Sequence, residues 1–174
     1  MRVSHSNNRV SVIYMMHRVC RTSVNITLIQ LAIELGAPID KGACTYLEAA
    51  VYEGDIKRVS FLVSAGADVN RDFGYPLMRA CHSERVDIID ILINAGADVN
   101  PGPIRYIQGI RMWNTIPNID DAILYRSPII MSKLLVAGAV LPNNAMDLAH
   151  RSNKCRTEKI KMLSEHYKIQ ECAL

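Results

Sequence analysis

Apolar residues recur along this chain at the spacing of short amphipathic helices, and the apolar runs end alike. The segments FLVSAGADVN (61–70) and ILINAGADVN (91–100) share their last six residues, and LAIELGAPID (31–40) and KLLVAGAVLP (133–142) carry the same glycine after an apolar run. Glycine has no Cβ atom, so it readily takes the left-handed backbone conformation that ends many helices. The pattern predicts that a helix ends at the glycine of each segment, namely at Gly36, Gly66, Gly96 and Gly138.

A second, shorter apolar segment precedes this helix in three copies: TYLEAA (45–50), YPLMRA (75–80) and, more loosely, NIDDA (118–122). Two positions recur in these segments, an apolar one (Leu47, Leu77, Ile119) and a small one (Ala50, Ala80, Ala122). Helix-start residues follow, at Asp55 in one copy and at Ser127-Pro128 in another. The unit is therefore a helix, a tight turn, a second helix and an extended turn rich in Asp and Asn. Because such a pair cannot bury its apolar face alone, neighbouring units must stack.

This unit resembles the ankyrin repeat, which has a usual period of ~33 residues and a first helix that opens with a TPLHxA-type motif. Residues 75–100 form the closest copy, and residues 45–70 are nearly as good. The resemblance implies an all-α ankyrin-repeat solenoid of about four to five helix-turn-helix units with short fingers and one long inserted finger near 101–118. We expect a single domain over residues 1–174, divided into an atypical N-terminal unit (about 10–43), repeats at about 44–73 and 74–103, a repeat with the long finger (about 104–142) and a C-terminal capping unit (about 143–174).

The two ends of the array are expected to be atypical. NITLIQLAIEL (25–35) supplies the second helix of the opening unit. In the closing unit we expect Ile160 and Leu163 to face inward and the many charged residues to face water.

The insertion PGPIRYIQGIRMWNTIPN (101–118) contains the only tryptophan of the chain and no acidic residue. Its alternation fits a hairpin with a turn at Gln108-Gly109. Trp, Tyr, Arg and Met are enriched at the centres of protein interfaces. The candidate anchors are Arg105, Tyr106, Arg111, Met112 and Trp113. The alternative is that this segment covers the edge of the adjoining helices.

The ankyrin resemblance implies a second binding surface, made of the finger tips and the inner face of the first helices. Carried over by position, the inner face holds Tyr52, Glu53, Arg79, His82 and Ser83, and a finger tip holds Arg71, Asp72 and Phe73. Each of these residues also has an ordinary interpretation as a solvated surface position. The resemblance further implies Asn70 and Asn100 as candidates for asparagine hydroxylation, although their role in the turn is a sufficient explanation for them.

Composition and motifs limit the binding and catalytic functions that we expect of this chain. The chain has 174 residues, of which 49% are hydrophobic and 21% charged, so it is predicted to fold; its net charge of +3 is spread along the chain and by itself does not indicate nucleic-acid binding. Its five cysteines have no metal-ligand spacing and are expected to be free thiols in a reducing compartment. No P-loop, GxGxxG, GxSxG or HExxH motif occurs. We expect no catalytic residue, no metal site and no cofactor.

The predicted function is that of a non-enzymatic protein–protein interaction module or scaffold. We expect a monomer in the cytoplasm, or in the nucleus, that binds a protein partner and no membrane. One alternative is nucleic-acid binding, with arginines on phosphates and Tyr106 or Trp113 stacked on a base; the arginines are Arg71, Arg79, Arg105 and Arg111. Another alternative is that the chain is a fragment of a larger ankyrin protein.

Overall fold

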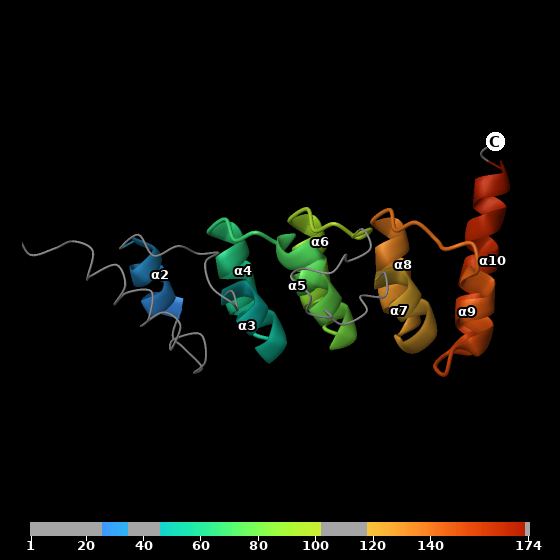
Figure 1. The fold of residues 1–174 in the computed structure, drawn as a ribbon, viewed down its shortest axis with the longest axis horizontal. Helices are drawn as coiled ribbons and strands as arrows, with labels where there is room; N and C mark the ends of the chain where they lie inside the picture. Colours follow the sequence, from blue (N-terminus) through green and yellow to red (C-terminus); the bar gives the residue numbers. More distant parts are fainter. Residues whose placement is uncertain (1–25, 35–45, 102–117, 173–174) are drawn as a thin grey trace, which may run out of the picture. The chain divides into compact units, whose positions relative to one another are not determined.

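A computed structural model describes residues 26–34, 46–101 and 118–172 of the chain. The described residues form helices joined by turns, and they contain no strand. The chain divides into two compact units, residues 1–68 and residues 69–174, and each is described by itself (Figure 1).

The first unit contains α2 (Ile26–Glu34), α3 (Tyr46–Glu53) and α4 (Ile56–Ser64). Helices α3 and α4 pack as a hairpin through buried residues that include Leu47, Ala50 and Leu62. The turn between them ends at Asp55, whose Oδ1 accepts the backbone N–H of Arg58 at 3.1 Å, as expected for a helix cap.

Arg58 is a buried cation that the sequence interpretation did not single out. Its side chain is only 5% exposed, and its guanidinium donates to the carboxylates of Glu53 and Asp55. The Arg58 backbone N–H also holds the pKa of Asp55 below its usual value. Because both carboxylates flank the turn, this ion-pair cluster stabilises the hairpin of the first unit.

The second unit is built from three helical hairpins that lie side by side. In chain order its helices are α5 (Arg71–His82), α6 (Val86–Asn94), α7 (Asn118–Tyr125), α8 (Pro128–Val136), α9 (Ala145–Arg151) and α10 (Arg156–Cys172). Helices α5, α7 and α9 form one row and α6, α8 and α10 form the other, with contacts along each row and within each hairpin (Figure 1). The core between the rows includes Leu77, Ala80, Ile89, Leu92, Ile119, Ala122, Met131 and Leu134, each at most 2% exposed. The predicted all-α repeat architecture is confirmed.

Three of the four predicted helix ends are confirmed, and the fourth, at Gly36, lies outside the described residues. Helices α4, α6 and α8 each end two residues before a glycine with left-handed φ, namely Gly66 (87°), Gly96 (85°) and Gly138 (90°). At Gly96 a Cβ atom would meet nothing within 4 Å, so the backbone conformation, and not crowding, is the reason for glycine. Helix α8 begins as predicted, with Ser127 Oγ accepting the N–H of Ile129 and Pro128 in the first turn.

The finger that precedes α5 is short, in agreement with the sequence. Asp72, Phe73 and Gly74 all have left-handed backbones, with φ of 49°, 60° and 77°, within the span assigned to α5. Regular helix follows from Tyr75, and Pro76 lies in its first turn. The finger therefore reverses the chain in a few residues.

Asn70, the last residue of the first AGADVN segment, binds the turn of the following copy. Its Nδ2 donates to the carbonyl oxygen of Gly96 at 3.0 Å, and its Oδ1 accepts the N–H of Asp98 at 2.6 Å. One side-chain amide thus uses both its donor and its acceptor on the backbone of the neighbouring turn.

Asn100 makes the equivalent contacts one copy later. Its Nδ2 donates to the carbonyl oxygen of Gly138 at 2.9 Å, and its Oδ1 accepts the N–H of Val140 at 2.8 Å. Asp98 Oδ1 accepts the N–H of Asn100 at 2.8 Å and fixes the local turn. We call the bidentate contact of the Asn70 or Asn100 amide with the neighbouring turn the asparagine clasp. It explains why the chain repeats the same turn residues.

The C-terminal end of α7 differs from that of α5. Helix α5 is followed by Glu84 in a left-handed conformation (φ 52°), whose N–H donates to the carbonyl oxygen of Cys81 at 3.1 Å. At the corresponding place after α7, Arg126 has no left-handed φ, and its N–H donates instead to Ala122 at 3.3 Å. The carbonyl groups near the end of α7 therefore need other donors.

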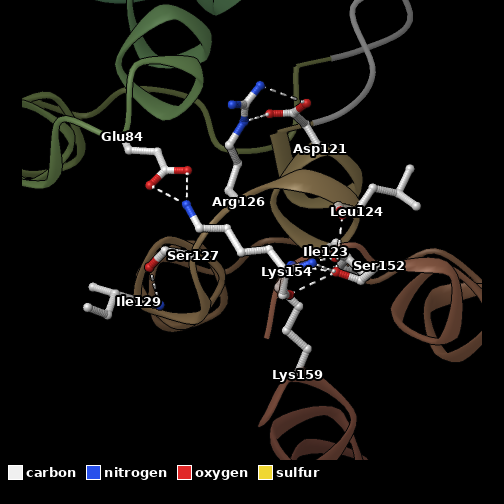
Figure 2. A network of polar contacts seen from close by, with 10 residues as sticks. All are labelled: Glu84, Asp121, Ile123, Leu124, Arg126, Ser127, Ile129, Ser152, Lys154 and Lys159. Atoms are coloured by element: carbon white, nitrogen blue, oxygen red, sulfur yellow. Dashed lines mark hydrogen bonds and ion pairs between the residues drawn. The ribbon is translucent and has the colours of Figure 1, made fainter. Parts of the chain in front are cut away.

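The closing hairpin supplies these donors (Figure 2). Lys159 Nζ donates to the carbonyl oxygen of Ile123 at 2.8 Å and to Ser152 Oγ at 2.8 Å. Ser152 Oγ lies 3.1 Å from the carbonyl oxygen of Leu124, within hydrogen-bond reach. An ammonium group at a helix C-terminus also interacts favourably with the helix dipole. The closing hairpin thus caps the last turn of α7.

The side chain of Lys159 is fully buried, at 0% exposed, and its burial lowers its pKa. Its N–H donates to the carbonyl oxygen of the residue just before its helix, as the N–H groups of Ile89 and Met131 do in α6 and α8. Lys159 therefore occupies in α10 the position that these two core residues occupy in their helices. The expectation that the charged residues of the closing unit face water is wrong for Lys159, because the open end of α7 requires a donor. Leu163 is buried as predicted, whereas Ile160 is only half-buried.

The first prediction concerns the asparagine clasp. Asn100→Ala removes two hydrogen bonds between neighbouring repeats and should lower the free energy of unfolding by about 1–2 kcal/mol, measured by urea denaturation. Asn144→Ala is the control, because the Asn144 side chain makes no cap hydrogen bond to α9, and it should change stability by less than about 0.5 kcal/mol. Equal losses in the two variants would contradict the clasp.

The second prediction concerns Lys159. Because the pKa of Lys159 is lowered from 10.5 by burial, the unfolded chain binds this proton more tightly than the folded chain. As pH rises from neutral toward 10.5, the cost of burying the charge is relieved, so the wild type should gain stability relative to Lys159→Met. Denaturation of both proteins across this range gives the difference. Lys161→Met, at an exposed lysine, should show no such change, and a pH-independent difference for Lys159→Met would refute the assignment.

Candidate interaction surface

The C-terminal ends of the first-row helices in the second unit form one edge of exposed side chains. His82 and Ser83, two of the predicted residues, are exposed at the end of α5, and Arg79 is half-buried one turn earlier. Tyr125 at the end of α7 is 48% exposed, and His150 near the end of α9 is exposed. Because α5, α7 and α9 lie side by side, their ends form a continuous row.

Tyr125 and His150 were not among the residues singled out from the sequence. Tyr125 follows Ala122 by the same spacing that separates Ser83 from Ala80, so alignment of the copies was the signal that pointed to it. The looser fit of the third and fourth copies hid this correspondence.

In the first unit, Tyr52 and Glu53 have different environments. Tyr52 is 69% exposed at the end of α3. The Glu53 carboxylate is bound to the buried guanidinium of Arg58 within the same hairpin. Tyr52 is therefore presented to solvent, and Glu53 has a structural role.

The predicted finger tip presents an aromatic side chain. Phe73 is 48% exposed, and its φ of 60° is rare for a bulky residue. Arg71 and Asp72 beside it form an ion pair at 3.5 Å. Backbone strain of this kind persists only where the surroundings impose it, and it gathers at ligand-contacting sites. Asn70 lies at the base of the same finger, where its amide forms the clasp described above.

The predicted anchors of the insertion lie outside the described residues, which resume at 118 after 101. These anchors are Arg105, Tyr106, Arg111, Met112 and Trp113.

Two cations at the turns of the second unit are paired with carboxylates (Figure 2). Arg126 Nε lies 2.7 Å from Asp121, and Lys154 Nζ lies 2.7 Å from Glu84. The Glu84–Lys154 pair joins the turn after α5 to the loop after α9. These cations already have anionic partners, which makes them poor phosphate ligands.

Cys81 is buried at 1% exposed, and burial, together with the charge of Asp121, raises the pKa of its thiol to about 12, so the thiol stays protonated at neutral pH. Within the described ranges no group of three His, Cys, Asp or Glu residues is arranged to hold a metal ion. No helix in the same ranges is long and apolar enough to span a bilayer.

Comparison with known families agrees with this architecture. A family model described as ankyrin repeats in three copies matches residues 16–102, which is half of the chain. The chain belongs to the ankyrin repeat family. Members of this family are generally protein–protein interaction modules and are typically non-enzymatic scaffolds. Helices α7 to α10 lie beyond the matched residues but continue the ankyrin hairpins. A search of curated proteins found no match.

The third prediction tests the inertness of Cys81. Two variants of the ankyrin chain each keep one cysteine, Cys81 or Cys155, with the other cysteines replaced by alanine. A thiol reagent at neutral pH should modify exposed Cys155 at least about 100-fold faster than Cys81, whose reaction requires local opening. Addition of denaturant should remove the difference, and comparable rates in the native proteins would show that Cys81 is accessible.

Proposed function

We propose that this ankyrin array is a non-enzymatic module that binds a protein partner through the finger tip at Phe73, the exposed ends of its first-row helices and the 101–118 insertion. The observation that carries the proposal is Phe73, an aromatic side chain held in solvent by a backbone conformation that disfavours it. A folded domain normally buries a phenylalanine, and aromatic residues dominate the energy of protein interfaces.

The clasps support presentation as the mechanism. Asn70 ties the base of the Phe73 finger to the turn after α6, so this finger is held before the partner arrives. Ordering of loops and side chains is one of the main costs of association, and a surface ordered in advance avoids much of it. The insertion would add the large amphipathic contacts typical of interface centres, through Arg105, Tyr106, Arg111, Met112 and Trp113.

We further propose that the protein acts as a monomer inside the cell, in the cytoplasm or nucleus. Nucleic-acid binding is the second candidate function. It has weaker support, because Arg71, Arg126 and Lys154 are paired with carboxylates. It predicts an affinity for DNA or RNA that falls steeply with salt, whereas the absence of a gel shift at low salt would eliminate it.

The fourth prediction separates binding from stability at the finger tip. Phe73→Gly removes the aromatic contact and relieves the left-handed strain, so stability should be equal or higher while capture of partner proteins from cell lysate falls at least about ten-fold. Cys155→Gly relieves the same kind of strain at φ 50° away from the finger tip, and it should capture partners as the wild type does.

The insertion is tested in parallel by replacing residues 101–115 with a short turn. Loss of the partners captured by the wild type would support its role as an anchor. Unchanged capture by both Phe73→Gly and the shortened chain would contradict the proposed surface.

A further inference from the structure

The outer face of the second-row helices changes character in one copy. On α6 and the turn after it, this face carries Asp87, Asn94 and Asp98, all exposed. On α8 and its turn, the corresponding positions carry Ile129, Val136 and Val140, which are 56%, 90% and 71% exposed. Asp87 and Ile129 each lie two residues after the cap residue of their helix, Arg85 or Ser127. The other two pairs lie two residues before and two residues after the glycine, Gly96 or Gly138. We call Ile129, Val136 and Val140 the outer strip.

The same positions in the first unit are also polar. They hold Lys57, Ser64 and Asp68, and all three are exposed. Two copies of the repeat therefore keep this face polar, as a solvated helix surface requires, and only the α8 copy among these three places aliphatic side chains on it. The core does not explain the change, because the buried face of α8 is already supplied by residues such as Ile130, Met131 and Leu134.

On α8, Ile129 and Val136 flank the half-buried side chains of Ser132 and Lys133. Ile129 and Val136 are seven residues apart on one helix, so they lie on the same face roughly 10 Å apart along the axis. Val140 lies in the turn after α8, where Asn100 Oδ1 accepts its N–H at 2.8 Å. In Figure 2 the Ile129 side chain points away from the polar network around Lys154.

An acidic row runs beside the strip. Helix α6 packs against α8 in the second row, and Asp87 and Asp98 occupy in the α6 copy the positions that Ile129 and Val140 occupy in the α8 copy. Asp90, between them, is bound by Lys133 of α8 at 2.6 Å. The carboxylates of Asp87 and Asp98 are exposed at the two ends of the row, and Asp98 also accepts the backbone N–H of Asn100.

We propose that the outer strip docks an amphipathic helix of a protein partner, with the apolar face of that helix on Ile129, Val136 and Val140 and basic residues on the flank that faces Asp87 and Asp98. A helix presents apolar residues at the i, i+3, i+4 and i+7 spacing, and Ile129 and Val136 are themselves seven residues apart on α8. Opposite charges along one flank fix its direction and register. The inference rests on the proposed protein-binding function but uses a different surface from the finger tip.

The test uses two labelled helical peptides in fluorescence anisotropy titrations with the full chain. Both carry leucines at i, i+3, i+4 and i+7; one has lysines along a single flank, and the other has glutamates at the same places. We expect the lysine peptide to bind at least about ten-fold more tightly than the glutamate peptide. Equal affinities, or no binding of the lysine peptide at its highest soluble concentration, would overturn the proposal.

The matched variant combines Ile129→Asp, Val136→Asn and Val140→Asp, which gives the α8 copy the outer residues of the α6 copy. Because those residues already function at these positions on α6, the fold should be kept, and circular dichroism checks this. Affinity for the lysine peptide should fall at least about ten-fold. The single variant Asp87→Lys, which keeps the turn at Asp98, should reduce the preference for the lysine peptide, and wild-type behaviour of either variant would contradict the strip.

Two further measurements distinguish other outcomes. Sedimentation velocity of the full chain should show a monomer; a dimer that the triple variant abolishes would assign the strip to a second copy and overturn the helix partner. Phe73→Gly should leave peptide affinity unchanged. One informative result is that Phe73→Gly loses the lysate partners and still binds the peptide, and the other is that the triple variant loses the peptide and still captures the lysate partners. Either result shows that the two surfaces act separately, so failure of the proposed function and failure of this inference can be distinguished.

Discussion

The side-chain amides of Asn70 and Asn100 are the contacts on which the stack of the second unit depends. A helical hairpin of this size has too little apolar surface to fold alone, and its stability comes from its neighbours. Each amide donates to the carbonyl oxygen of a following glycine and accepts an N–H two residues beyond it. The clasp therefore requires a left-handed glycine in one copy and an asparagine in the copy before it. This mutual requirement is the physical reason for the repeated AGADVN sequence.

At the end of the array, the carbonyl groups of one helix need hydrogen-bond donors. Helix α7 is not followed by a left-handed residue at Arg126, so its last carbonyl groups lack the backbone donor that α5 receives from Glu84. The closing hairpin solves this with Lys159 and Ser152, and the cost is a buried ammonium group with a lowered pKa. A charged residue at a core position makes the hairpin specific for its neighbour, because that ammonium would lose its acceptors in any other arrangement.

The two faces of this stack differ in the side chains that they expose. The ends of the first-row helices and the finger tip present mixed aromatic and polar groups, among them Phe73, His82 and Tyr125. The second-row face is polar along α6 and apolar along α8. Since repeats of one array share the same backbone, a change of side chains in a single copy alters the surface without altering the fold. Ankyrin proteins can in this way gain a binding surface at little structural cost.

Local interactions were predictable from the sequence alone. The helix caps at Asp55 and Ser127, the glycine helix ends, and the buried positions Leu77 and Ile119 all follow from residues close in the chain, whose spacing fixes the period of the repeat. Contacts between copies were not predictable in the same way. The acceptors of Lys159 lie 36 and 7 residues away in the chain, and a lysine is normally assigned to the surface until its acceptors are known. The outer strip became visible only when the second-row helices were packed side by side, because the burial of an aliphatic side chain depends on what covers it. Short-range stereochemistry is written in the chain itself, whereas burial and the pairing of distant polar groups are decided by the tertiary structure.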